Sequence, residues 1–326
     1  MKGAARSRGG FGRLGRAFSV IRNYGFSSHR LEESLDSFRE FLRDNDCPAT
    51  FACPSALLRR SEDLVGFLKE FDVAIHGMEH IDYRTVTAER IGSDLRQAIS
   101  DFESVGLNPS GFRAPYLRWN RDMIMALARS GLAYDSSSSV FWNVGGRDLA
   151  SRKEVGKVLD FYSSEYEVDA PSLPRIEDGV VRLPVSLPDD EMLIERLAID
   201  RPEELLAYWL EMLKKSYERS ELLVLQVHPE RFPICEEALG HLLEEVRKRN
   251  IWNATLGEVA SWWIERDGAV SAEGDATKAR GSLDKGLWPQ DHQSAFCLTG
   301  DIDAMSVGDF LRRTVSRGTK NRIRGA

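Results

Sequence analysis

Hydrophobic positions along the chain follow two spacings. Short apolar runs are typical of strands, whereas apolar residues three and four positions apart are typical of one helix face. Residues 29–43 have helical spacing, since Leu31, Leu35 and Phe38 share a face, whereas residues 221–227 form the clearest buried strand. These patterns predict strands at 18–21, 49–53, 73–75, 111–116, 132–135, 180–185, 221–227 and 252–255, and helices at 29–43, 61–71, 87–105, 121–130, 202–219, 236–248 and 256–266.

The order of these elements predicts the fold class. Strands alternate with helices, which predicts an α/β protein built on a parallel sheet or barrel. In such folds ligands bind at the carboxyl ends of the strands. Four polar residues, His76, Arg113, Asp135 and His228, fall at the ends of predicted strands. Their positions therefore point to one functional edge.

Differences in composition divide the chain into segments. Residues 1–17 and 316–326 are basic and are predicted to be disordered tails. Residues 18–266 hold the alternating strands and helices. Residues 267–287 are polar, rich in Gly and Ala and aperiodic, which predicts a flexible linker. A second ordered segment, residues 288–315, contains a predicted strand and helix.

Composition narrows the function classes. The chain has 326 residues, of which 42% are hydrophobic and 29% charged, as in soluble globular proteins. The net charge of −7 argues against a nucleic-acid partner. We expect no transmembrane segment and no signal peptide, since no apolar run is long enough. The four scattered cysteines predict reduced thiols and a cytoplasmic location. Assembly into a homo-oligomer stays open.

A histidine pair carries the first chemical signal. His76-Gly-Met-Glu-His80 follows the apolar run that ends at Ile75. Two imidazoles four residues apart at the end of a strand can bind one divalent cation. With a third ligand and an open position, they would form a hydrolytic metal site. The pair alone is a weak motif, so its weight depends on the later segments.

Three further motifs occur in a family-specific order. Ala49-Thr-Phe51 lies on an early strand, Phe112-Arg-Ala-Pro-Tyr116 follows the histidine pair, and Leu225-Gln-Val-His228 comes late. Together with the histidine pair, this order resembles the polysaccharide deacetylases of carbohydrate esterase family 4 over roughly residues 18–264. The resemblance implies a distorted (β/α) barrel of about seven strands.

The resemblance also implies an activity and a set of site residues. The activity is metal-dependent N-deacetylation, with zinc the usual metal and an acetylated amino sugar the substrate. His76 and His80 would bind the metal, and His228 would protonate the leaving amine. Arg113 would orient the base carboxylate, and a backbone N–H near Tyr116 would help to hold the oxyanion.

The first motif of the family is missing near the N-terminus. The family's first strand ends in T-F-D-D, which supplies a base and a metal ligand. The first predicted strand here runs into Arg22-Asn-Tyr-Gly25, which has no carboxylate. Asn23 cannot act as a base, and an amide is a poor zinc ligand. The N-terminal part of the chain would therefore hold a metal with two histidines and lack a base.

A C-terminal sequence offers a replacement. Residues 296–303 end in T-G-D-I-D, and residues i and i+2 of a strand point to the same side. We predict that this segment folds back over the linker, docks beside the first strand and supplies Asp301 as base and Asp303 as metal ligand. Two other arrangements stay open. The strand could dock in another protomer, or the aspartates could form an acidic turn that caps a helix at Ser306.

For three other polar residues the sequence gives weaker evidence of a role in the site. Asp82 follows His80 and could orient it through a hydrogen bond. Asp189 and Asp190 are adjacent, and one of them could contact His228 or the metal. A simple loop turn is equally compatible with that pair.

Aromatic residues offer candidate sugar contacts. Phe141-Trp142 follows a serine run near the predicted barrel mouth, which makes it the better candidate for a sugar-stacking surface. Trp262 and Trp263 lie on the last helix of the barrel and are expected in the core.

Three functions remain compatible with the sequence. The first is a deacetylase that acts on a cytoplasmic glycan or glycan precursor. The second is a non-catalytic relative that binds carbohydrate or a partner. The third is hydrolysis of another non-peptide C–N bond on the same metal. A carboxylate at the metal would separate the first function from the second.

Overall fold

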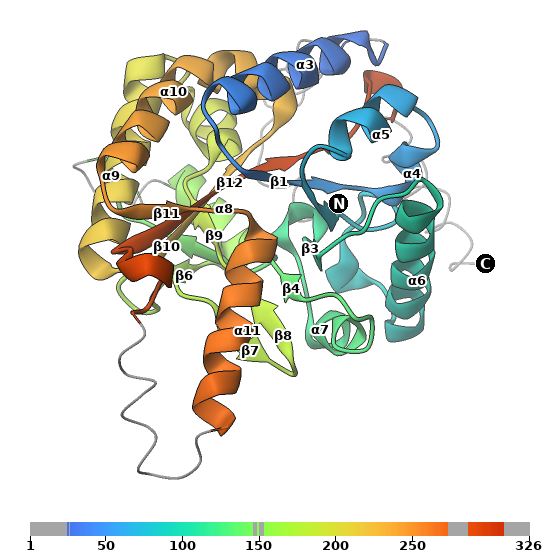
Figure 1. Ribbon diagram of the computed structural model, residues 1–326. Coiled ribbons are helices and arrows are strands. Elements are labelled where there is room, and N and C mark those ends of the chain that lie inside the picture. The colour runs from blue at the N-terminus through green and yellow to red at the C-terminus, as the bar shows by residue number, and fades with distance from the viewer. Residues whose placement is uncertain (1–24, 26, 146–148, 150–152, 273–285, 310–326) are drawn as a thin grey trace.

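The computed structural model describes residue 25 and residues 27–145, 149, 153–272 and 286–309 (Figure 1). The predicted N-terminal strand, both basic tails, most of the linker and the end of the C-terminal helix lie outside these residues. Within them, the helices are α3 (His29–Asp44), α4 (Ser55–Leu58), α5 (Glu62–Leu68), α6 (Ala88–Ser104), α7 (Arg121–Leu127), α8 (Lys153–Tyr162), α9 (Pro202–Arg219), α10 (Phe232–Lys248) and α11 (Leu256–Ala272).

Most strands lie where the apolar runs predict them. The described strands are β1 (Ala49–Cys53), β2 (Asp72–Ile75), β3 (Gly111–Phe112), β4 (Tyr134–Asp135), β5 (Ser139–Phe141), β6 (Glu165–Tyr166), β7 (Arg175–Glu177), β8 (Val180–Arg182), β9 (Val185–Leu187), β10 (Leu222–Val227), β11 (Ile251–Asn253) and β12 (Ser294–Asp301). All twelve belong to one sheet, in the order β6-β5-β9-β10-β12-β1-β2-β3-β4-β8-β7, with β11 beside β12.

The sheet curls into a distorted (β/α) barrel, so the predicted fold class is confirmed. Figure 1 shows the sheet with helices packed around it. The β7–β8 pair is antiparallel, and the other strand pairs of the described sheet are parallel. Its outermost strands, β6 and β7, are joined by an ion pair at 3.2 Å between Glu165 and Arg175. Every predicted catalytic or metal-binding residue follows or ends one of these strands.

The C-terminal strand lies inside the sheet rather than at its edge. β12 pairs in parallel with both β10 and β1, so that Leu298 lies opposite Leu225 on one side and Ala49 on the other. In Figure 1, β12 runs between β1 and β10. The chain therefore docks its C-terminal segment next to β1, the second strand of the sequence-based prediction.

Two predicted segments differ from the structure. The single strand predicted at 180–185 is wrong, because it divides at Leu183-Pro184 into β8 and β9. β8 pairs with β4 and β9 with β10, near opposite ends of the sheet order. The predicted linker begins too early, since α11 continues through Ala272.

Local signals set several helix ends. Ser61 caps α5 by accepting a hydrogen bond from the Leu64 N–H, as its position before the helix predicts. α9 begins with Pro202 in its first turn and ends at Ser220, which adopts a left-handed conformation. No described helix is both long enough and apolar enough to span a membrane.

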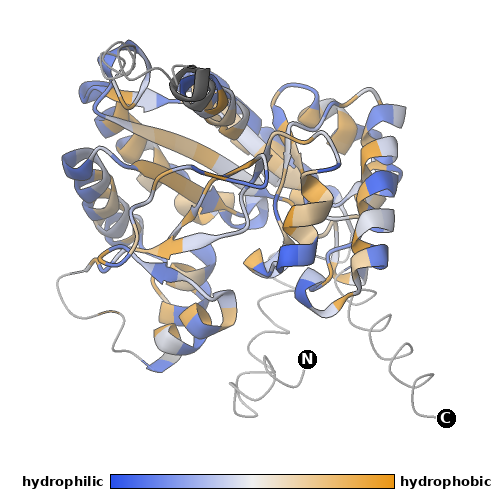
Figure 2. Ribbon diagram, turned by 90° about the horizontal axis from the view of Figure 1, so that it is seen from below, coloured by the Kyte–Doolittle hydropathy of each residue, from blue (hydrophilic) through white to orange (hydrophobic). Residues whose placement is uncertain are grey.

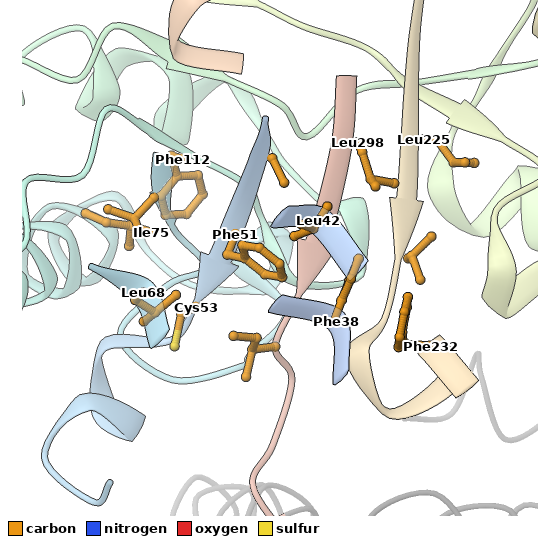
Figure 3. Packing of buried hydrophobic residues seen from close by; sticks show 14 of the residues in the cluster. Phe38, Leu42, Phe51, Cys53, Leu68, Ile75, Phe112, Leu225, Phe232 and Leu298 are labelled. Atoms are coloured by element: carbon orange, nitrogen blue, oxygen red, sulfur yellow. The ribbon is translucent and has the colours of Figure 1, made fainter. Parts of the chain in front are cut away.

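The main hydrophobic core lies between the sheet and its covering helices. Phe38 of α3 stacks on Phe232 of α10 with ring centroids 4.4 Å apart, and its edge meets Phe51 of β1. Figure 3 shows these rings beside Leu225 and Leu298 of the neighbouring strands. In Figure 2 the hydrophobic colour gathers on strands and on inward helix faces. This packing holds α3 and α10 over the strands that carry the candidate site.

Gly300 of β12 provides a test of the central position of that strand. A Cβ atom at Gly300 would clash with the buried Phe51 ring. We expect Gly300→Ala to lower the free energy of unfolding by about 1–3 kcal/mol, as overpacking does. Urea unfolding of both proteins measures the difference.

The matched control is Gly66→Ala in α5. A Cβ at Gly66 meets nothing within 4 Å, so the better helix propensity of alanine should raise stability by up to about 1 kcal/mol. If Gly300→Ala were as stable as the wild type, β12 would not pack this closely on β1.

Candidate active site

Two histidines and one carboxylate converge at the carboxyl ends of β2 and β12. The Oδ1 atom of Asp303 lies 2.9 Å from Nε2 of His80 and 3.4 Å from Nε2 of His76. The three ligand atoms lie within 4.8 Å of one another. Gly77, with φ +84°, turns the chain between the histidines, where a Cβ would collide with Tyr83.

These residues fit a divalent metal ion. Nδ1 of His76 lies 2.9 Å from the carbonyl oxygen of Arg113. If Nδ1 donates its hydrogen there, the Nε2 lone pair is left to face the cluster. Tetrahedral zinc ligands at 2.0–2.1 Å from the metal lie roughly 3.3 Å from one another, close to the distances found here. Two imidazoles and one carboxylate also match the ligand set of known catalytic zinc sites.

A second carboxylate lies beside this cluster. Asp301 ends β12 and is buried, with Oδ2 at 4.0 Å from Nε2 of His76. Its Oδ1 accepts a hydrogen bond at 2.6 Å from Nη1 of the buried Arg113. The same Nη1 also lies 2.8 Å from the Thr299 hydroxyl. This charge-assisted contact fixes the orientation of the Asp301 carboxylate.

The serine run after β4 supports Arg113 from its other side. The guanidinium donates to the carbonyl oxygen and the hydroxyl of Ser136, at 3.1 and 2.9 Å. The Ser137 hydroxyl bonds the buried carboxylate of Asp135 and accepts from the Ala114 N–H. Asp135 is therefore held by the serine run and by an ion pair with Arg182.

His228 follows β10 and is held by one of the two adjacent aspartates. Oδ1 of Asp190 lies 2.7 Å from Nδ1 of His228, and Oδ2 accepts the His228 backbone N–H at 2.7 Å. Burial alone would lower the pKa of His228, but the Asp190 carboxylate outweighs it and raises this pKa well above its usual value. His228 therefore keeps a proton at neutral pH and can act as an acid.

Asp189 differs from its neighbour. Its Oδ1 accepts the Met192 N–H at 2.9 Å, so it caps the following helical turn. Burial and the adjacent Asp190 raise the pKa of Asp189 to about 7. The structure thus assigns the contact with His228 to Asp190 and the turn to Asp189.

The strand register places His228 close to Asp301. Val227 of β10 pairs with Gly300 of β12, and the residues that follow are His228 and Asp301. The Tyr116 ring packs edge-on against His80, with centroids 4.4 Å apart. The structure thus brings together all seven candidate residues, His76, His80, Arg113, Tyr116, His228, Asp301 and Asp303.

Two weaker expectations are wrong, and one stays a prediction. Trp142 is fully buried in the core and cannot stack on a sugar. Ser306, whose Oγ accepts from the Asp309 N–H, caps the C-terminal helical turn, so Asp301 and Asp303 do not form that cap. The contacts found for Asp82 are an ion pair with Arg118 and a hydrogen bond from Arg84, so its effect on His80 stays a prediction.

A surface hollow lies at the other end of the strands. About 560 Å³ in volume, it is bordered by Trp252, Trp262 and Asp72. Asp72 begins β2, whereas His76 follows the end of that strand. The hollow is therefore remote from the cluster of His76, His80 and Asp303. Trp262 is half-buried and packs against the core, while Trp263 is buried as expected.

Comparison with known proteins supports the resemblance seen in the motifs. Residues 27–134 match the family model of polysaccharide deacetylases. This region includes the histidine pair and the Arg113–Tyr116 motif. No curated protein matches the chain in sequence.

Three solved structures share the fold. A putative polysaccharide deacetylase from Mycobacterium smegmatis is 23% identical, with a TM-score of 0.55 over 70% of this chain and 76% of that chain. A probable polysaccharide deacetylase from Pseudomonas aeruginosa PAO1 is 15% identical, with a TM-score of 0.56 over 71% and 73%. PuuE allantoinase is 14% identical, with a TM-score of 0.52 over 76% and 75%. The resemblance predicted from the motifs is confirmed, since residues 27–134 match the polysaccharide deacetylase model and the chain shares its fold with these structures.

Proposed function

We propose that this protein is a metal-dependent hydrolase that removes the N-acetyl group from an amino sugar in a cytoplasmic glycan or glycan precursor. One observation carries the proposal. The cluster of His76, His80 and Asp303 lies beside a buried carboxylate held by Arg113, and the adjacent strand carries a histidine held by Asp190. Amide hydrolysis needs these three elements, namely a Lewis acid, a base and an acid.

The metal site supplies the electrophilic part of the reaction. A divalent metal, of which zinc suits this donor set best, would polarise the acetyl carbonyl and lower the pKa of a water in the open position. His76, His80 and Asp303 would hold it. A backbone N–H close to Tyr116, whose ring packs on His80, would stabilise the negative charge on the carbonyl oxygen.

Asp301 acts as the base in this proposal. Its carboxylate lies beside the cluster and takes a proton from the attacking water. Arg113 holds the carboxylate in place through its Nη1. Ser136 also holds the Arg113 side chain through two hydrogen bonds. The fixed guanidinium therefore restricts the Asp301 carboxylate to one position.

His228 acts as the acid. Its Nε2–H gives a proton to the leaving nitrogen as the C–N bond breaks, and the free amine departs. Asp190 holds Nδ1 and so directs Nε2 toward the site. His228 follows β10 and Asp301 ends β12, so the acid and the base lie on adjacent strands.

Two alternatives remain for experiment. The binding-protein alternative rested on the missing carboxylates near Asn23. The positions of Asp303 beside His76 and of Asp301 beside Arg113 support the proposal that these two residues supply them. Hydrolysis of a different C–N bond would use the same residues, because the acyl group is recognised by the shape of the pocket. The shared fold of an allantoinase makes a cyclic ureide a sensible comparison substrate.

Acetate release tests the proposal. We expect metal-free protein, reloaded with zinc, to release acetate from N-acetylated amino-sugar oligomers, and chelation to stop the release. The same samples are incubated with a formamide and a cyclic ureide. Hydrolysis of the formamide or the cyclic ureide alone would support the hydrolysis of another C–N bond. If none of the three kinds of compound were hydrolysed, the binding-protein alternative would be supported.

A further inference from the structure

Gln226 is a buried polar residue that the proposed reaction does not use. It lies on β10 two positions before His228, and in the strand register it lies opposite Thr299, which contacts Arg113. Only 5% of the residue is exposed. Gln226 is the one polar residue of the strand Leu222–Val227. Because burial of an amide group costs free energy, we expect its side chain to make a specific polar contact.

The side-chain amide of Gln226 faces the reactive nitrogen of His228. Its Nε2 lies 3.5 Å from Nε2 of His228. Its Oε1 is buried, and among the described residues it has no hydrogen-bond partner. A buried carbonyl oxygen without a partner destabilises the folded state. A half-turn about the last side-chain bond exchanges the positions of the amide oxygen and nitrogen.

The protonation state of His228 decides which amide atom should face it. Nδ1 of His228 is committed to Asp190 at 2.7 Å, so only Nε2 changes between donor and acceptor. An imidazolium presents Nε2–H, which needs an acceptor, and Oε1 of Gln226 can supply it after a half-turn of the amide. A neutral imidazole presents a lone pair, which the amide NH₂ group can satisfy.

We propose that Gln226 is a positioning residue that turns its amide with the protonation state of His228 and so stabilises that ring before and after proton transfer. Its role in catalysis rests on the proposed function. Before the reaction, His228 Nε2–H donates to Gln226 Oε1. When the proton moves to the leaving nitrogen, His228 becomes neutral, and the turned amide donates an N–H to Nε2.

Other charged groups also face His228. Asp190 and Glu230 favour the imidazolium, and Arg231 opposes it. Asp189 follows β9 and also interacts with His228. The raised pKa of His228 agrees with an acceptor at Nε2, which is the orientation that gives Oε1 a partner. A leucine at position 226 could fill the space of Gln226, but it could form a hydrogen bond with neither the protonated nor the neutral form of His228.

The test is the titration of His228, followed by ¹⁵N NMR of the imidazole in the metal-free full chain. We expect Gln226→Leu to lower the His228 pKa by about one unit, since a hydrogen bond to a charged group is lost. Gln226→Glu should raise it, because a carboxylate would face Nε2–H. Asp190→Asn is the positive control and should also lower it.

Activity gives a second, independent readout. In Gln226→Leu the alkaline limb of kcat/KM should move to lower pH by the same amount as the NMR titration. An unchanged His228 pKa in both Gln226 variants, with a lowered pKa in Asp190→Asn, would overturn the proposal. The NMR result needs no substrate, so a protein without deacetylase activity would refute the proposed function while leaving the Gln226 contact testable.

Discussion

Replacing Asp303 by alanine is expected to abolish metal binding while the fold is kept. Asp303 provides the only carboxylate in the cluster of ligand atoms found among the described residues. It follows β12 and its side chain is partly exposed, so its loss leaves no buried cavity. Because removing even a supporting partner of a ligand costs 10–100-fold in metal affinity, we expect loss of this ligand to cost more than about 100-fold.

Metal content per chain, measured by elemental analysis after dialysis against a weak chelator, checks this result. Asp309→Ala is the matched control, since Asp309 belongs to the same segment and pairs with Arg60 rather than with the histidines. The control should keep its metal, and thermal unfolding should show both variants folded. Full metal content in Asp303→Ala would assign the third ligand to another residue.

Replacing Asp301 by asparagine should separate catalysis from metal binding. The amide keeps the shape of the side chain and can still accept a hydrogen bond from Arg113, but it cannot take a proton from water. We expect acetate release to fall by about 10²–10⁴-fold, the usual contribution of a general base. Metal content should stay at the wild-type level because His76, His80 and Asp303 are unchanged.

Glu79→Gln is the matched control for this experiment. Glu79 lies inside the histidine motif, but its side chain is exposed, and we expect its replacement to leave acetate release unchanged. Loss of activity in Glu79→Gln with full activity in Asp301→Asn would move the base from the C-terminal strand to the histidine motif. Equal loss in both variants would show that the assay reports charge near the site rather than a base.

Elements with strong local signals could be predicted from the sequence. α9 has Pro202 in its first turn and a left-handed residue after its last turn, and its predicted bounds match the structure. β1 was likewise predicted at 49–53 as observed. In both cases the signals lie within a few residues of the element. The alternation of strands and helices predicted a parallel sheet or barrel, and the family resemblance specified the barrel.

Features that depend on distant residues could not be predicted this way. The division of the strand at Leu183-Pro184 reflects pairing with β4 and β10, which are remote in sequence. The burial of Trp142 depends on packing in the core. The convergence of Asp303 with His76 and His80 was accessible despite its large sequence separation, because residues 296–303 resemble the family's missing first motif. The sequence could not show which of Asp189 and Asp190 contacts His228, because the two carboxylates are adjacent and follow the same strand.

The central place of β12 has a consequence for the order of folding. β1 and β10 flank a strand that the ribosome makes after both of them, so the middle of the sheet closes only through contacts of very large sequence separation, such as Ala49 with Leu298. Contacts of this kind slow folding, because a long loop must close before they form. A nascent chain that ends before Ser294 would expose two unpaired strand edges, which are prone to aggregate. Synthesis of residues 294–303 would thus complete both the middle of the sheet and the proposed metal site in a single step.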